Sequence, residues 1–257
     1  MARNAGAELR VVSAWPSDAD QDEIFVMRAG LREQIAAFPG ATDAFDLDLS
    51  IRMRRAAPVD AILGEAARFH PDLIILGSHG DPRLRDVLFG TTAMKVAREA
   101  NHPVLIVQTD HTRPYEKLLV AIDDCAAKQV LRLALGIGTA KDIHVVHVGG
   151  SVGESLFGGG ETLERVRADQ EVLTGEVADL VRTFGLSSAT PRIHQVVEDG
   201  DAIDVIMRSW ATLKPDLLIM GTAGRGGLAR VFRESHAKTV ILGCPSDILI
   251  ARTHIDG

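Results

Sequence analysis

Aromatic residues are scarce in this chain and make up only 4% of its 257 residues. A core built mainly from Leu, Val, Ile and Ala suits parallel sheets better than aromatic-rich β-sandwiches. The two cysteines, Cys125 and Cys244, form no metal-binding or redox motif and are expected to be reduced, partly buried thiols. No apolar run approaches the roughly 18 residues that cross a bilayer, and the N-terminus lacks the apolar segment of a signal peptide. We therefore expect a cytoplasmic protein with no membrane partner.

Long basic runs are also absent, and the net charge is −7. The stretch 52–55 holds three arginines, but it is short and is predicted to be an exposed strand end. Nucleic acid is therefore not an expected partner. The chain contains neither the Gly-Lys-Ser/Thr of a P-loop nor the Gly-x-Ser-x-Gly of a hydrolase nucleophile elbow. No positioned general base for attack on phosphate is visible, so an enzyme is not expected either.

What the chain does contain is an internal repeat. Residues 70–80 (HPDLIILGSHG) return 144 positions later as residues 214–224 (KPDLLIMGTAG). Each copy is an apolar run, typical of a buried parallel strand, that ends in Gly-x-x-Gly. Glycines at the end of such a strand allow a sharp turn and a close approach to a ligand. The repeat predicts two similar halves, each with a candidate phosphate-binding loop.

Strands and helices are predicted to alternate through both halves, which favours parallel sheets with helices on both faces. The predicted fold class is α/β, with two tandem doubly wound domains at residues 1–109 and 117–257 and a linker at 110–116. The predicted strands are 9–15, 47–53, 73–76 and 103–107, then 118–123, 143–148, 192–197, 217–220 and 248–251. The predicted helices are 21–38, 58–69, 91–100, 126–136, 161–184, 201–213 and 235–242.

The two halves differ at their beginnings. The second half has a predicted strand and helix between Lys117 and Gly138, ahead of its strand at 143–148. The first half has only residues 1–8 in that place, and residues 1–6 look like the end of a helix with a glycine stop. We infer that the first half lacks its opening strand and most of its opening helix. A start codon assigned too late would explain this, and the alternative is that the chain evolved that way.

The loop of the first half carries the candidate ligand site. Its pattern is Gly77-x2-Gly80-x9-Gly90-Thr91-Thr92. Gly77 and Gly80 allow close backbone approach to an anion, and Gly90 opens a helix whose free N–H groups and positive dipole end favour phosphate. The hydroxyls of Thr91 and Thr92 add donors. The alternative is that these are plain turn glycines, since the chain holds 24 glycines.

These residues resemble the ATP-binding class of universal stress proteins. The glycine pattern, the ending HPVLIV at 102–107 and the strand 119–123 (LVAID) all carry the resemblance, and two copies resemble the tandem form. The resemblance implies strand order 3-2-1-4-5 in each half and pairing of the halves through their last strands. It also implies that the glycines and Thr91 hold the phosphates of ATP, with or without Mg²⁺. Asp123 would lie near the ribose or the metal.

The second half departs from that pattern. It keeps Gly221 and Gly224, but Glu234 stands where Gly90 stands in the first half, followed by Ser235. A carboxylate about 4 Å from a phosphate charge costs roughly 4 kcal/mol at an effective dielectric near 20, which is on the order of a thousandfold in affinity. We therefore predict that the second half binds ATP poorly, while the first keeps its glycines but lacks the strand that forms one wall of the adenine pocket.

The functional hypothesis from the sequence is a stress-response binding module that responds to adenine nucleotide and acts through protein partners of unknown identity. One alternative is a protein of the same fold that holds another small or lipid-like ligand, or none. Another is a slow ATPase or an autophosphorylating enzyme. A monomer in which the two halves pair with each other and a homodimer both stay open.

Overall fold

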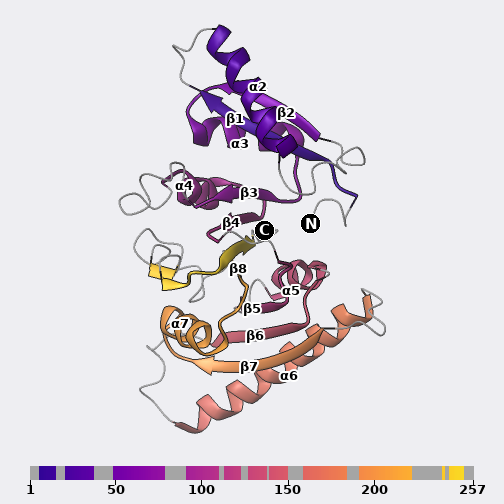
Figure 1. Ribbon diagram of the computed structural model, residues 1–257. Coiled ribbons are helices and arrows are strands. Elements are labelled where there is room, and N and C mark those ends of the chain that lie inside the picture. Colours follow the sequence, from indigo (N-terminus) through magenta and orange to yellow (C-terminus); the bar gives the residue numbers. More distant parts are fainter. Residues whose placement is uncertain are drawn as a thin grey trace. The chain divides into compact units, whose positions relative to one another are not determined.

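The computed structural model describes residues 6–15, 21–37, 49–78, 91–109, 113–122, 127–137, 139–149, 159–183, 191–221, 239–240 and 243–251 (Figure 1). Strands and helices alternate over most of the chain, as the sequence predicts. The strands are β1 (Leu9–Trp15), β2 (Leu49–Arg55), β3 (Ile74–Gly77), β4 (Val104–Val107), β5 (Lys117–Ile122), β6 (Asp142–Gly149), β7 (Arg192–Asp199), β8 (Leu217–Gly221) and β9 (Asp247–Ala251). The helices are α2 (Gln21–Ala37), α3 (Pro58–Phe69), α4 (Thr91–Glu99), α5 (Ala127–Gly136), α6 (Gly159–Thr183) and α7 (Ala202–Leu213).

The chain forms two compact units, Met1–Pro71 and Asp72–Gly257. We call them the first unit and the second unit. Their boundary falls inside the first copy of the sequence repeat, between α3 and β3. The boundaries at 109 and 117 follow the sequence repeat and stay a prediction. None of the helices in the described residues is long and apolar enough to cross a membrane.

The second unit contains a seven-stranded sheet in the order β3-β4-β9-β8-β5-β6-β7. The second repeat supplies β5 to β9, and all of their mutual pairings are parallel. Numbered within that repeat, the order is 3-2-1-4-5, which confirms the expected topology. β4 and β9 are the last strands of the two repeats, and they pair antiparallel, with Ile106 opposite Ile248. The predicted pairing through the last strands is thus also confirmed.

The first unit contains a separate two-stranded parallel sheet, in which β1 pairs with β2 from Leu9↔Leu49 to Trp15↔Arg55. Among the described residues β1 has no second neighbour, and β3 pairs only with β4. The first repeat therefore contributes to two sheets, where the second repeat forms one. That the first repeat lacks an opening strand stays a prediction from the sequence.

Continuous apolar runs form the core of the second unit because parallel strands are buried on both faces. All five residues of β8 and of β9 are buried. Helices α5 and α6 pack on one face of the sheet and α7 packs on the other (Figure 1). The largest fully buried side chains are Ile106, Leu118, Leu119, Ile122, Ile143, Ile206, Leu217, Leu218, Ile219 and Met220.

The helix ends show why the two repeats fold alike. His70 and Lys214 occupy equivalent positions, and both adopt the left-handed conformation, with φ of 50° and 47°. Their backbone N–H groups donate to the carbonyls of Ala66 and Trp210, at 2.9 and 2.8 Å. Such a cap satisfies a free carbonyl at the end of each helix and turns the chain into the next strand. The sequence repeat is therefore a structural repeat down to its turns.

Some predicted boundaries were displaced by one or two residues. The strand predicted at 47–53 is observed at Leu49–Arg55, because Arg54 and Arg55 continue the register opposite Ala14 and Trp15. Helix α7 begins one residue later than predicted, since Asp201 is its N-cap and accepts the N–H groups of the second and third residues. The predicted helix at 235–242 lies mostly outside the described residues, which include its positions 239–240.

Candidate functional site

The predicted phosphate loop of the first repeat has well-defined ends. Gly77 is the last residue of β3, and Thr91 and Thr92 open α4. The first turn of α4 contains no acidic residue, so its free N–H groups meet no competing carboxylate from that turn. A helix start of this kind favours phosphate or another anion. Gly80 and Gly90, the other two glycines of the motif, lie outside the described residues.

Packing fixes the direction of α4. Ala93, Val96 and Ala97 are buried, and Thr92 is half-buried beside them. At the other end of the loop, Ser78 is buried and its backbone N–H donates to the Val107 carbonyl at 2.8 Å. The strand end and the helix start are thus both held by the fold.

The corresponding loop of the second repeat is described only at its beginning. Gly221 ends β8, is buried, and lies opposite Ala251 of β9. Gly224, Glu234 and Ser235 lie outside the described residues, and so does Asp123, which follows the end of β5. The predicted effect of Glu234 on phosphate binding therefore stays a prediction.

The two strand ends differ in exposure, although their sequences are similar. Gly77 is exposed and Gly221 is buried. Two residues earlier, the side chain of Ile75 is 50% exposed, whereas the equivalent Ile219 is 0% exposed. The difference arises because β5 lies beside β8, while no described strand lies on that side of β3. Within the described part of the chain, β3 therefore has no neighbour in the place that β5 takes beside β8.

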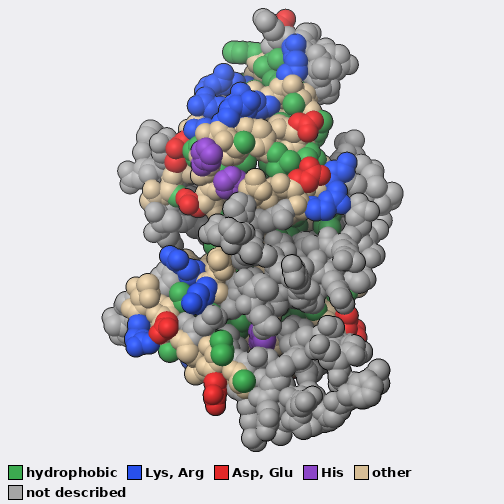
Figure 2. Space-filling view, turned by 180° about the vertical axis from the view of Figure 1, so that it is seen from behind, with side chains coloured by type: hydrophobic (Ala, Val, Ile, Leu, Met, Phe, Trp, Pro, Cys, Tyr) green, Lys and Arg blue, Asp and Glu red, His purple; other side chains and the backbone are tan. Residues whose placement is uncertain are grey.

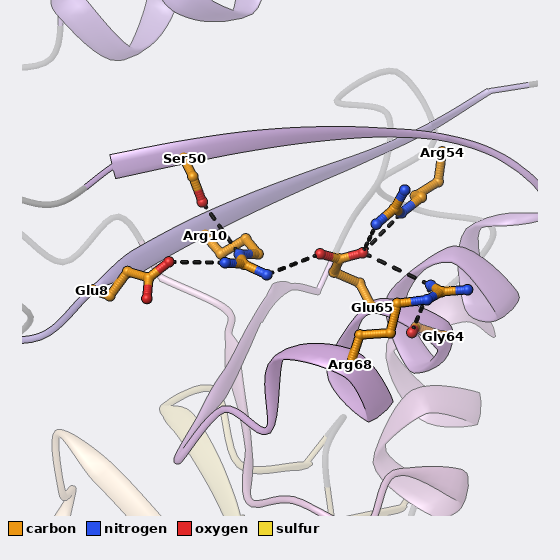
Figure 3. Close-up of polar contacts among 7 residues, drawn as sticks. All are labelled: Glu8, Arg10, Ser50, Arg54, Gly64, Glu65 and Arg68. Carbon is orange, nitrogen blue, oxygen red and sulfur yellow. Dashed lines mark hydrogen bonds and ion pairs between the residues drawn. The ribbon is translucent and has the colours of Figure 1, made fainter.

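A buried carboxylate with arginine partners was not predicted from the sequence. Glu65 of α3 is 3% exposed. Arg10 of β1 contacts its Oε1 at 3.2 Å, and Arg54 of β2 donates from Nε to its Oε2 at 2.8 Å, with a second contact from Nη2 (Figure 3). Arg68 lies 3.9 Å from the same oxygen. The arginine-rich strand end at 52–55 is thus only partly a solvated surface, because Arg54 joins this network.

The network ties β1, β2 and α3 of the first unit together. Arg10 also donates to Ser50 Oγ at 3.2 Å and to Glu8 at 2.9 Å, and its guanidinium stacks 3.8 Å from the centre of the Phe69 ring. Burial acts to raise the pKa of Glu65, but the hydrogen bonds and charges of Arg54 and Arg10 outweigh it and hold that pKa below its usual range. Further basic side chains gather on the surface of this unit (Figure 2).

The equivalent place in the second repeat is a groove of about 230 Å³ between β6, β7 and α7. Ser209 stands where Glu65 stands in the first repeat, and the shorter side chain fills less space. The rings of His144 and His194 stack there across the two strands, 4.5 Å apart. Burial, and then the neighbouring His194, lower the pKa of His144. No group of three or more side chains in the described residues is arranged to hold a metal ion.

The segment predicted as a linker is anchored by a second buried carboxylate. Asp247 at the start of β9 is 0% exposed. It accepts the backbone N–H groups of Gln108 and Thr109 at 2.8 and 3.1 Å, the Thr109 hydroxyl at 3.0 Å, and the Tyr115 hydroxyl. Burial and then the Asp247 carboxylate raise the pKa of Tyr115 above its usual range. The passage from β4 to β5 is therefore fixed by the fold at both of its ends.

The two cysteines were expected to be reduced and partly buried. Cys244 is free and fully buried, and burial raises the pKa of its thiol to about 12. A pKa raised this far keeps the thiol protonated at neutral pH, and its burial goes further than the partial burial that was expected. Cys125 lies outside the described residues.

Comparison with known proteins agrees with this architecture. The family model described as "Universal stress protein family" matches residues 1–108 and again residues 114–252. The chain belongs to the universal stress protein family. The double match also shows the tandem form, with one family domain in each sequence repeat.

Two curated members of the universal stress protein family align with part of the chain. The stress response protein NhaX of Bacillus subtilis (strain 168) is 28% identical over 92 residues, which cover 36% of this chain and 55% of NhaX. The universal stress protein in the QAH/OAS sulfhydrylase 3′ region of Thermus aquaticus is also 28% identical over 92 residues, covering 36% of this chain and 57% of the relative. The chain therefore spans little more than half the length of these relatives.

A solved universal stress protein from Archaeoglobus fulgidus DSM 4304 matches over most of its length. The match has a TM-score of 0.63 and 16% sequence identity, and it covers 98% of this chain and 88% of that one. At this level of identity the likeness concerns the fold.

Proposed function

We propose that this universal stress protein is a stress-response binding module that holds ATP in the loop between Gly77 and Thr92. The observation that carries the proposal is the pair of loop ends. β3 ends in a glycine, and α4 begins with two threonines and no acidic residue in its first turn. Crevices at the carboxyl ends of parallel strands are the usual ligand sites of such sheets, and a helix start with free N–H groups suits phosphates.

The donors available there match a polyphosphate. The backbone N–H groups of the first turn of α4 and the hydroxyls of Thr91 and Thr92 offer hydrogen bonds to phosphate oxygens. Bound ATP would order the loop and change the surface that protein partners contact. We propose binding alone, without hydrolysis, and therefore expect no steady-state release of phosphate from ATP.

We propose that the second repeat binds ATP weakly, because Glu234 occupies the position that corresponds to Gly90 of the first repeat. A reciprocal pair of substitutions in the full chain tests this reasoning. Gly90→Glu should weaken ATP binding by about a thousandfold if the carboxylate meets the phosphates. Gly90→Gln is the matched control, since it adds a side chain of the same size without charge. Glu234→Gly should add a second binding event.

Calorimetric titration with ATP measures the affinity and the number of sites in the full chain and in the Gly90→Glu, Gly90→Gln and Glu234→Gly variants. We expect one site per chain before substitution. The absence of any adenine nucleotide binding, or equal binding by the Gly90→Glu and Gly90→Gln variants, would contradict the proposal.

A second candidate function follows from the exposed end of β3. The described residues provide no strand beside Gly77 to form one wall of an adenine pocket, so this loop is also open to a different small or lipid-like ligand. Native mass spectrometry of the purified protein separates the two candidates, because a retained nucleotide and a retained lipid differ in mass. A lipid in place of nucleotide would favour the second.

A further inference from the structure

The groove beside the stacked histidines is built by the second repeat alone. All of its lining residues lie between His144 and Leu213, on β6, β7 and α7. The first repeat offers a direct comparison, because its β1, β2 and α3 are the counterparts of these three elements. What fills the matching position in the first repeat therefore indicates what the groove is suited to hold.

The repeat of 144 positions and the strand register align the two places residue by residue. The equivalent pairs are Ser50 and His194, Glu65 and Ser209, and, across the strands, Arg10 and His144. In the first repeat the position is filled by the Glu65 side chain, a carboxylate on two methylene groups, whose Oε1 lies 3.2 Å from Arg10 (Figure 3). In the second repeat the shorter Ser209 leaves this space to the groove, and an imidazole replaces the guanidinium.

Two side chains of the groove offer hydrogen bonds that the described part of the chain does not use. The His144 ring is half-buried and stacks on His194, but its nitrogens make no hydrogen bond to any residue that the structure describes. The half-buried Ser209 hydroxyl has no hydrogen-bond partner among those residues either. Both groups line the groove, so both are placed to donate to one ligand.

The charges near His144 favour an anion as that ligand. The charged and titratable groups around it are Asp142 of β6, His194 and Glu198 of β7, Arg208 of α7 and Lys117 of β5. Each of the two carboxylates already has an arginine partner, at 2.8 Å for Asp142 and at 3.1 Å for Glu198. Burial, and then His194, lower the pKa of His144. An anion beside the ring would oppose this, because it stabilises the charged imidazole.

We propose that this groove binds a small organic carboxylate, which accepts hydrogen bonds from the protonated His144 ring and the Ser209 hydroxyl. Its carbon chain packs against Val146, Val196 and Leu213, which also line the groove. The ligand thus takes the place that the Glu65 side chain takes in the first repeat. With a volume of about 230 Å³, the groove is smaller than pockets for drug-sized ligands and suits a short-chain acid.

The test uses butyrate as the probe and the full 257-residue chain. Proton NMR follows the ring of His144, whose signal is identified by its loss in His144→Asn. Saturating butyrate should raise the pKa of His144. At pH values above that pKa, binding should weaken by about tenfold for each pH unit, because the ring must take up a proton. Butyramide has the same shape without the charge and should not shift the signal.

Substitutions at Ser209 locate the ligand. Ser209→Glu supplies a carboxylate from α7, as Glu65 does from α3, so it should raise the pKa of His144 without ligand and weaken butyrate binding by about tenfold or more. Ser209→Gln is the matched control, since it fills the same space without charge and should block butyrate while leaving that pKa unraised. Ser209→Ala keeps the groove open and should weaken binding by about fivefold, the loss of one hydrogen bond.

Several outcomes overturn the proposal. One is a His144 signal that butyrate does not change, and another is equal binding of butyramide and butyrate. Butyrate binding that is as tight in Ser209→Glu as in the unsubstituted chain would place the ligand elsewhere. Inorganic phosphate has no carbon chain and should bind at least about tenfold more weakly than butyrate. Equal binding of the two would make the groove a general anion site.

Discussion

Replacing Asp247 with alanine should strongly destabilise the second unit. Its carboxylate is fully buried and accepts hydrogen bonds from two backbone N–H groups, the Thr109 hydroxyl and the Tyr115 hydroxyl. Alanine leaves these donors without an acceptor, and each buried unsatisfied donor costs about 1–3 kcal/mol. Since the hydroxyls can rotate toward other acceptors, we expect a total loss of about 4 kcal/mol.

Urea unfolding followed by tryptophan fluorescence measures this loss. The chain has two tryptophans, and the Trp210 indole N–H donates to Ser246 Oγ at 2.9 Å, next to Asp247. A Trp15→Phe background removes the signal of the first unit. With an m-value of about 2 kcal/mol/M, the midpoint should fall by about 2 M in urea.

Asp247→Asn separates the hydrogen bonds from the space that the side chain fills. The amide oxygen can still accept the two backbone N–H groups, and the amide NH₂ can donate to the Tyr115 hydroxyl, so the loss should be about 1 kcal/mol. Asp179→Ala, at an exposed surface pair, is the control and should change stability by less than about 0.5 kcal/mol. If Asp247→Ala costs no more than that control, the carboxylate does not anchor the chain between β4 and β5.

Three further results are expected. Glu65→Gln should destabilise the first unit by about 3 kcal/mol and flatten the dependence of its stability on pH. The folded pKa of Glu65 lies below the unfolded value, so its contribution is complete above about pH 5 and is lost as the pH falls toward the lowered pKa. Urea midpoints measured at several pH values test this. Equal falls in acid for the unsubstituted chain and the Glu65→Gln variant would contradict it. In a Cys125→Ser background, Cys244 should react with a thiol reagent only after denaturation, since its pKa is raised to about 12; rapid labelling of the native chain would disprove this. Ile219→Ala should cost about 3 kcal/mol and Ile75→Ala less than about 1; equal losses in denaturant titrations would show that the edge of β3 is covered.

Much of the fold could be predicted because its signals are local. Apolar runs such as 217–220 identify buried parallel strands, and the repeat of the Pro-Asp turn at positions 71 and 215 aligns the two halves. Strand order in the second repeat came from the family resemblance. The end of β2 was misjudged, since Arg54 and Arg55 are charged, and their strand conformation depends on pairing with β1 and, for Arg54, on Glu65.

The hydrogen-bond networks around the buried carboxylates of Glu65 and Asp247 could not be predicted, because their partners are distant in sequence. Arg10 and Glu65 are 55 positions apart, and Tyr115 and Asp247 are 132 apart. No periodicity links such pairs, and a lone acidic residue in a helix usually predicts a solvated face. The candidate loop was identified through its glycines, whose spacing is local. Its interior, with Gly80 and Gly90, lies outside the described residues.

The antiparallel contact between β4 and β9 has a practical consequence for dissecting this protein. Producing the second repeat by itself, from a start in the segment 110–116 where the sequence repeat suggests a natural division, would leave out β4 and expose the backbone of Ile248, Leu249 and Ile250. Such a fragment would have an exposed edge strand, β9, and would therefore be prone to aggregate. Fragments that begin at Asp72 keep both strands, and they are the better starting material for studying the two candidate loops apart from the first unit.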